Sequence, residues 1–217
     1  MLEHVILKLK ASGFDEIVIN VHHFANQILD FLKANDNFGV NIYISDETEE
    51  LLDTGGGLEK AGKYFMPPLH EDKEGILLHN VDILSNCDLQ DLIRFHQQNP
   101  DVYATMLVSR RITSRYLLFD DNNLLCGWIN KNTGQVKPAG LEYKEGKYQE
   151  YAYSGIQAIN PLLLNKGMRP GKYSIIDFYL QVCRNIRIQC YPVDNLQLID
   201  IGKPETLTKA EEFLNHL

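Results

Sequence analysis

Positive charge, long apolar runs and paired cysteines are all scarce in this 217-residue sequence. Its 21 Lys and Arg residues against 29 Asp and Glu residues give a net charge of −8, which argues against a protein that coats nucleic acid, because that role needs a basic surface. No apolar run approaches the roughly 20 residues that span a bilayer, so we expect no membrane segment. The first residues also lack the basic region of a signal peptide.

The few cysteines are widely separated and form no C-x-x-C pair. This spacing argues against a disulfide framework and against a zinc site, so we expect a reducing compartment, namely the cytoplasm. The cysteines are Cys87, Cys126, Cys183 and Cys190.

Helical and strand patterns alternate along the first half of the sequence. Apolar residues recur at helical spacing over 2–9 and 28–32, and a short helix is expected over 58–65. Asp88 is placed to cap a further helix. Short β-branched or apolar runs predict strands at 17–21, 40–44, 76–80 and 102–108. Such alternation predicts right-handed crossovers and a mostly parallel sheet.

The second half changes character. Runs at 117–119 and 124–129 flank the turn Asp120-Asp121-Asn122-Asn123 and predict an antiparallel hairpin. Further strands are expected at 151–159, 186–190 and 198–200, with a helix at 175–182 and a closing helix from Pro204. We therefore expect a single α/β domain over residues 1–217, with a mostly parallel sheet and an antiparallel insertion.

A glycine cluster, Thr54-Gly55-Gly56-Gly57, precedes the helix expected over 58–65. Consecutive glycines let a backbone approach a ligand closely and leave N–H groups at a helix N-terminus, although a tight turn is an equally good interpretation. The run from Gly57 to Lys63 also matches G-x-x-x-x-G-K, but Tyr64 stands where a P-loop needs Ser or Thr. We therefore reject a P-loop.

Two acids, Asp82 and Asp200, each follow an apolar stretch. A carboxylate at such a strand end can hold Mg²⁺ against phosphate oxygens. A helix cap or a solvated acid is the commoner outcome for either residue alone. Two acids that are far apart in sequence but both at strand ends could share one Mg²⁺, which is a hypothesis about their geometry.

Taken in order, several segments resemble the sugar-1-phosphate nucleotidyltransferases, in particular the bacterial group of N-acetylmuramate-1-phosphate uridylyltransferases and mannose-1-phosphate guanylyltransferase-like proteins. They span nearly the whole sequence and occur in the family's order. The segments are Ile17-Val18-Ile19-Asn20-Val21-His22-His23, Ser45-Asp46-Glu47, Leu52-Asp53-Thr54-Gly55-Gly56-Gly57-Leu58, Asn80-Val81-Asp82, Tyr153-Ser154-Gly155-Ile156 and Asp200-Ile201-Gly202-Lys203-Pro204-Glu205.

The resemblance implies a Rossmann-like nucleotide-diphospho-sugar transferase fold and the reaction of an NTP with a sugar 1-phosphate to give an NDP-sugar and pyrophosphate. It implies Mg²⁺ as cofactor, with Asp82 and Asp200 as catalytic residues and metal ligands. The implied nucleotide-binding residues are Thr54, Gly55, Gly56, Gly57 and Asn80. The implied sugar-binding residues are Tyr153, Ser154 and Gly155.

The sequence departs from the family's pattern in three places. Val81 stands where the family usually has Gly, and Lys203 stands where it has Thr. The family's N-terminal strand and glycine-rich, arginine-containing loop have no counterpart, and the sequence begins in what resembles the following helix. We therefore expect a domain that is N-terminally incomplete relative to the family, with weakened neutralisation of the triphosphate and with a sheet edge that invites a homo-oligomer.

Two other functions stay open at this point. One is a non-catalytic relative that binds a nucleotide or a sugar nucleotide as a sensor or partner subunit. The other is an unrelated α/β binding domain of the response-regulator kind, which the antiparallel insertion and the second acid disfavour. Neither the base nor the sugar can be predicted from the glycine backbone.

Overall fold

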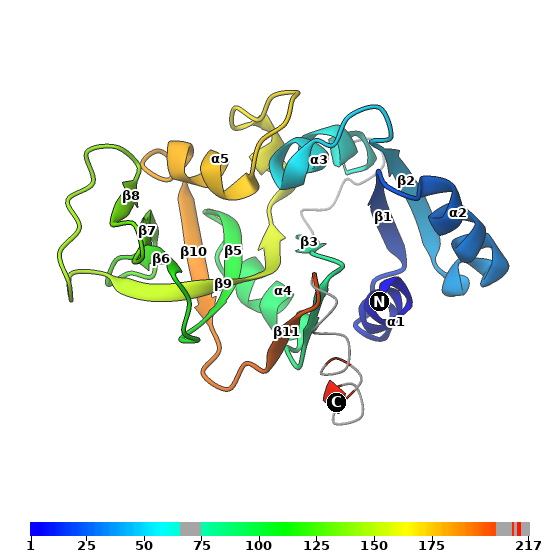
Figure 1. The fold of residues 1–217 in the computed structure, drawn as a ribbon, viewed down its shortest axis with the longest axis horizontal. Coiled ribbons are helices and arrows are strands. Elements are labelled where there is room, and N and C mark those ends of the chain that lie inside the picture. The colour runs from blue at the N-terminus through cyan, green and yellow to red at the C-terminus, as the bar shows by residue number, and fades with distance from the viewer. Residues whose placement is uncertain (66–74, 203–209, 211, 214–217) are drawn as a thin grey trace. The chain divides into compact units, whose positions relative to one another are not determined.

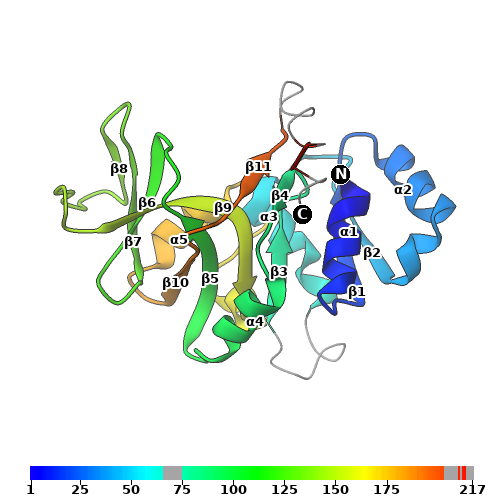
Figure 2. The same ribbon diagram turned by 90° about the horizontal axis from the view of Figure 1, so that it is seen from below.

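The computed structural model describes residues 1–65, 75–202, 210, 212 and 213, and the chain divides into two compact units. Unit 1 contains Met1–Lys73 and Pro161–Tyr179, and unit 2 contains Glu74–Asn160 and Leu180–Leu217. Figures 1 and 2 show the elements of both units from two directions. Each unit is described by itself below.

Unit 1 is built on two parallel strands, β1 (Glu16–Val21) and β2 (Asn41–Asp46), which are connected through helix α2 (Ala25–Ala34) and the 3-10 turn η1 (Asp36–Gly39). The register pairs Ile17 with Ile42 and Ile19 with Ile44. Residues two apart in a strand share a face, so these isoleucines form one apolar layer. Helix α1 (Leu2–Ala11) buries Val5, Ile6 and Leu9, the residues whose spacing predicts the helix.

Two further segments complete unit 1. Helix α3 (Asp53–Ala61) and the 3-10 turn η2 (Gly62–Tyr64) follow β2. A later part of the chain adds the 3-10 helix η3 (Pro161–Asn165) and the beginning of helix α5 (Ile175–Val182).

Unit 2 contains a seven-stranded mixed sheet with the order β10-β5-β9-β6-β7-β8, in which β3 also pairs with β9. Strands β5 and β10 are parallel, and the other pairs of this sheet are antiparallel. The strands are β3 (Ile76–His79), β5 (Val102–Ser109), β6 (Arg115–Phe119), β7 (Leu125–Asn130), β8 (Gln135–Lys137), β9 (Gln149–Ile159) and β10 (Arg187–Pro192).

A buried polar network lies within unit 2. His96 on helix α4 (Leu89–Gln97) is buried, and its Nδ1 lies 2.8 Å from the Thr105 hydroxyl of β5. Gln189 of β10 donates its amide to the same hydroxyl oxygen at 2.9 Å. Burial lowers the pKa of His96 to about 4, because the charged imidazolium would lose its hydration.

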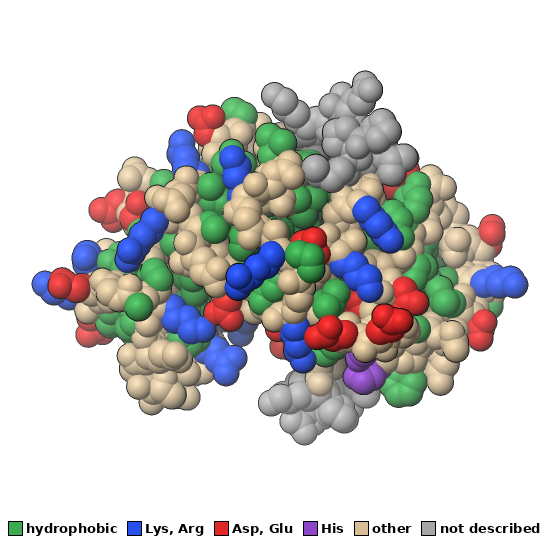
Figure 3. Space-filling model, turned by 90° about the horizontal axis from the view of Figure 1, so that it is seen from above, with side chains coloured by type: hydrophobic (Ala, Val, Ile, Leu, Met, Phe, Trp, Pro, Cys, Tyr) green, Lys and Arg blue, Asp and Glu red, His purple; other side chains and the backbone are tan. Residues whose placement is uncertain are grey.

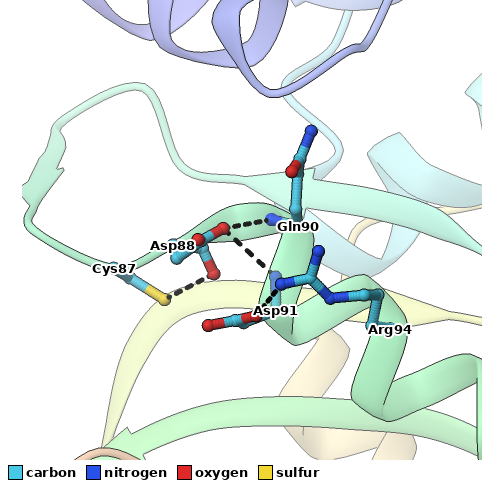
Figure 4. A network of polar contacts seen from close by, with 5 residues as sticks. All are labelled: Cys87, Asp88, Gln90, Asp91 and Arg94. Atoms are coloured by element: carbon cyan, nitrogen blue, oxygen red, sulfur yellow. Dashed lines mark hydrogen bonds and ion pairs between the residues drawn. The ribbon is translucent and has the colours of Figure 1, made fainter.

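Helix α4 begins at a side-chain cap, as the sequence predicts. The Asp88 carboxylate accepts hydrogen bonds from the backbone N–H groups of Gln90 and Asp91 at 2.8 and 3.2 Å (Figure 4). These are donors that the first turn leaves without helical partners. Arg94 pairs with Asp91 one turn later, and Cys87 donates its thiol to the Asp88 carbonyl (Figure 4).

A second, small sheet in unit 2 pairs β4 (Ile83–Ser85) antiparallel with β11 (Leu198–Asp200). The register places Asp200 opposite Ile83 and Leu198 opposite Ser85. Two segments that are far apart in the sequence are thereby brought side by side. This small sheet decides where the two acids lie.

The prediction of a mostly parallel sheet is wrong. Parallel pairing of strands occurs between β1 and β2 and between β5 and β10, whereas the other strand pairs of the described residues are antiparallel. The reason is β9, an 11-residue strand that runs between its neighbours in the opposite direction. The predicted antiparallel insertion therefore belongs to the main sheet. The helix expected from Pro204 begins outside the described residues.

The four cysteines are free thiols, as the sequence predicts. Among the described residues, none of the helices has the length and apolar character that a membrane crossing requires. On the face drawn in Figure 3, basic and acidic side chains are interspersed.

Candidate functional site

Asp82 and Asp200 lie together at one end of the β4–β11 pair. The Ile201 N–H donates to the Asp82 carbonyl at 2.9 Å, which continues the pairing beyond the strands. A Cβ added at Gly202 would lie 3.2 Å from Asp200 Oδ1 and 3.4 Å from Asp82 Oδ2. The two carboxylates therefore converge on the backbone of Gly202, where an added Cβ would be in close contact with both oxygens.

The electrostatics of this acidic pair fit a cation. Burial and the neighbouring Asp200 charge raise the pKa of Asp82, so the two carboxylates are held together against their mutual repulsion. Carboxylate oxygens are the ligands that Mg²⁺ prefers, and Mg²⁺ commonly takes one or two of them and keeps waters or phosphate oxygens in its other positions. Among the described residues there is no group of three or more His, Cys, Asp and Glu side chains that could hold a metal ion. The acidic pair therefore suits Mg²⁺ bound by two carboxylates with water or phosphate oxygens in its other positions, and it does not resemble a site in which protein side chains enclose the metal.

Asn80 and the segment Tyr153-Ser154-Gly155 also meet within unit 2. Strand β9 bulges here, since the register with β5 shifts between Met106 and Val108, and Gly155 has a φ of 80°. The Asn80 N–H donates to the Gly155 carbonyl at 3.0 Å, and a Cβ at Gly155 would lie 3.1 Å from the Asn80 amide. The bulge thus turns the β9 backbone toward Asn80, two residues before Asp82.

The hydroxyl groups of this segment differ in their surroundings. Ser154 is buried, and its hydroxyl donates to the Leu107 carbonyl at 2.7 Å. Burial raises the pKa of the Tyr153 hydroxyl, so that group stays protonated. Arg111 donates to the Tyr153 carbonyl at 2.9 Å. Ser154 therefore stabilises the bulge, and among the described residues its hydroxyl has only backbone partners and no general base to make it a nucleophile.

The glycine segment, Thr54 to Gly57, lies inside α3 of unit 1 and not ahead of the helix as expected. All three glycines are buried, and each is closely approached by the chain itself. A Cβ at Gly55 would overlap the Tyr173 ring, and one at Gly56 would overlap the Gly171 carbonyl. The requirement for glycine here is explained by packing, and contact with a nucleotide stays a prediction.

Hydrogen bonds also tie the glycine segment to the chain around Tyr173. The N–H groups of Gly55 and Gly56 donate to the Tyr173 carbonyl at 2.9 and 3.4 Å. The Thr54 hydroxyl accepts from the Ile175 N–H at 3.0 Å and so caps the first turn of α5. These donors are used within unit 1, so the segment differs from an open phosphate-binding loop.

Glu47 belongs to one of the segments that resemble the family, but the sequence assigned it no role. Its side chain is only 4% exposed, and its two oxygens accept hydrogen bonds from the Asn20 amide at 2.7 Å and the Leu52 N–H at 3.1 Å. Its backbone carbonyl lies 2.5 Å from His22 Nδ1. In sequence, Glu47 is one of several acids in a polar stretch after β2, and nothing in that stretch marks it as the buried one.

Comparison with protein families identifies a match to the nucleotidyl transferase model over residues 1–120. The chain is 28% identical over 151 residues to the UTP–glucose-1-phosphate uridylyltransferase of Synechocystis sp., covering 64% of this chain and 36% of that protein. It is 36% identical over 63 residues to the N-acetylmuramate alpha-1-phosphate uridylyltransferase of Caulobacter vibrioides, covering 28% and 26%. It is 27% identical over 167 residues to mannose-1-phosphate guanylyltransferase 1 of Arabidopsis thaliana, covering 76% and 43%. The chain thus spans less than half the length of these relatives.

Solved structures with the same fold include HddC from Yersinia pseudotuberculosis, crystallised with GMP-PN, with a TM-score of 0.71 at 19% identity. That match covers 98% of this chain and 84% of that one. The inositol-1-phosphate CTP transferase from T. maritima has a TM-score of 0.71 at 12% identity, covering 99% and 81%. These similarities show that the chain shares the fold of these two proteins.

Proposed function

The chain belongs to the nucleotidyl transferase family, and from that premise we propose that it forms an NDP-sugar and pyrophosphate from an NTP and a sugar 1-phosphate. The observation that carries this proposal is the convergence of Asp82 and Asp200 on Gly202. Mg²⁺ at a phosphate-transfer site is commonly held by one or two carboxylates, and this pair supplies two that lie close together.

The reaction needs positioning and charge neutralisation more than covalent catalysis. A phosphate oxygen of the sugar 1-phosphate attacks the α-phosphorus of the NTP, and the bond to the leaving pyrophosphate breaks in line. Asp82 and Asp200 would hold Mg²⁺, and the bound ion would supply neutralisation of charge on the phosphate oxygens. The half-buried setting of Asp82 strengthens its interaction with a cation, because less water competes for the carboxylate.

Within the same proposal, Asn80 and the glycine segment contact the nucleotide. Tyr153, Ser154 and Gly155 border the sugar, with Ser154 setting the shape of the β9 bulge because its hydroxyl is already bonded to Leu107. The free thiols favour a reaction in the cytoplasm.

The test is a pyrophosphate-release assay with UTP, GTP or dTTP, candidate sugar 1-phosphates and Mg²⁺. D82N and D200N are expected to lower turnover at least about a hundredfold, because each removes an anionic ligand. The exposed Asp194 of the same unit offers the control D194N, which should keep full turnover. If D82N keeps the turnover of the wild type, Asp82 is not a ligand of the metal. Nucleotide binding without any pyrophosphate release would favour the non-catalytic relative.

A further inference from the structure

Asn20 occupies the carboxyl end of β1, one residue before that strand ends. Its register partner on the parallel strand β2 is Ser45. Ligands of parallel α/β sheets bind at the carboxyl ends of the strands, so Asn20 stands at an edge of unit 1 where a ligand would be expected. Asn20 is exposed, in contrast to the neighbouring Val21.

Glu47 fixes the orientation of the Asn20 amide. The Asn20 Nδ2 donates to Glu47 Oε1 at 2.7 Å, while Glu47 Oε2 accepts from the Leu52 N–H at 3.1 Å. A carboxylate that receives two donors acts only as an acceptor, so the amide must direct its NH₂ group toward Glu47. The carbonyl oxygen of Asn20 is thereby presented on the other side, and among the described residues no donor reaches it.

Asn20 and Glu47 also pack against the glycine segment at Gly57. A Cβ at Gly57 would lie 2.5 Å from Asn20 Nδ2 and 2.7 Å from Glu47 Oε1. The absence of a side chain at Gly57 therefore allows the amide and the carboxylate to meet directly over α3. This places an oriented acceptor beside the segment that, in the proposed function, contacts the nucleotide.

We infer that Asn20 Oδ1 is a specificity-determining acceptor that selects bases carrying a ring N–H, namely uracil, thymine and guanine. Uracil and thymine present N3–H and guanine presents N1–H on their pairing edge, whereas the equivalent nitrogens of cytosine and adenine carry a lone pair. A lone pair facing Asn20 Oδ1 leaves both acceptors unpaired, which disfavours those bases. The inference rests on the proposed function and adds the class of nucleotide to it.

Glu47 has a positioning role in this selection, and its replacement makes a sharp test. In E47Q, the Leu52 N–H still requires the oxygen of the new side chain, so the NH₂ group of the introduced glutamine faces Asn20. The Asn20 amide must then turn over, offering its oxygen to that NH₂ group and its own NH₂ group to the ligand. Loss of packing alone would weaken all nucleotides equally, whereas a reversed amide shifts the preference toward cytosine.

The experiment is equilibrium binding of UTP, GTP, CTP and ATP with Mg²⁺ to the full chain. We expect UTP or GTP to bind at least about tenfold more tightly than CTP and ATP, and N20A to remove that preference by weakening the favoured nucleotide about tenfold. In E47Q, the ratio of CTP to UTP affinity should rise about tenfold. N26A, at another exposed asparagine of unit 1, should leave all four affinities unchanged.

Each outcome has a distinct meaning. Equal affinities in the wild type, or a preference that N20A leaves intact, would overturn this inference while the proposed function stands. No binding of any nucleotide would overturn both. If E47Q does not fold, as judged by its thermal melting, N20A decides the question because Asn20 is exposed.

Discussion

Unit 1 rests on a two-stranded parallel sheet, whereas unit 2 contains a seven-stranded mixed sheet. A two-stranded sheet has little stability of its own, and unit 1 compensates with side-chain hydrogen bonds and close backbone contacts around α3. Unit 2 instead buries residues of β5 and β9 completely, among them Ala104, Met106, Leu107, Ile156 and Ala158. Single contacts should therefore contribute more to stability in unit 1, whereas changes at the acidic pair of unit 2 should affect function more than stability.

The largest expected effect is that of G56A in unit 1. The added methyl would overlap the Gly171 carbonyl, and backbone cannot move aside as a side chain can, so we expect a loss of about 3 kcal/mol in the free energy of unfolding. Urea unfolding followed by circular dichroism measures it. G62A is the matched control, since a Cβ there would lie 3.3 Å from the flexible Leu164 side chain and should change stability by less than about 1 kcal/mol. Equal effects of the two variants would contradict the close packing of the glycine segment.

The second effect belongs to unit 2 and depends on pH. Above about pH 6.5, His96 is neutral in both the folded and the unfolded chain and adds no pH dependence. Between that pH and about 4, the unfolded chain binds a proton that the folded chain rejects, so the free energy of unfolding should fall by about 3 kcal/mol. Urea unfolding at several pH values measures the slope. H96Q should show a clearly shallower slope, and identical slopes would show that His96 is not the responsible group.

A smaller effect is expected where unit 2 depends on one local contact. D88A removes the cap of α4 and should lower the free energy of unfolding by about 1 kcal/mol. Hydrogen exchange of the first turn of α4 should accelerate with it. D101N, at an exposed acid beyond the other end of α4, is the control and should have no measurable effect.

G202A is expected to have the smallest effect on stability, although its effect on function should be clear. The added methyl would lie 3.2 and 3.4 Å from carboxylate oxygens of Asp200 and Asp82, which can move, so the free energy of unfolding should change by less than about 1 kcal/mol. The methyl would nevertheless spread the two acids, and the Mg²⁺ concentration that gives half-maximal turnover should rise about tenfold. An unchanged Mg²⁺ requirement would show that the convergence on Gly202 is not the metal site.

Periodicity predicted most elements, because apolar spacing reports which face of a helix or strand is buried. Local turn and capping residues likewise predicted the Asp88 cap and the hairpin around Asp120. The sequence did not predict that β9 runs antiparallel to β3, β5 and β6, since strand direction depends on contacts between distant segments. The sequence also did not predict that β5 pairs in parallel with β10, because that pairing joins segments that are far apart in the chain.

The candidate site shows the same division. The sequence placed Asp82 and Asp200 after apolar stretches, but their proximity depends on the pairing of β4 with β11. It identified the glycines and offered ligand contact or a tight turn as their reason, whereas the structure shows Tyr173, Gly171, Asn20 and Glu47 packed against them. Contact with a nucleotide stays a prediction. A buried Glu among exposed acids carries no local signal, because its burial is a property of the three segments that surround it.

The short pairing of β4 with β11 also has a consequence for the order of events during synthesis. Asp82 leaves the ribosome long before Asp200, and the two carboxylates can meet only once β11 has been made and has closed a very long loop onto β4. Sequence-distant contacts of this kind form slowly. A growing chain would therefore form most of its sheet before the two carboxylates meet, so incomplete chains would be folded in large part and yet lack the proposed Mg²⁺ site.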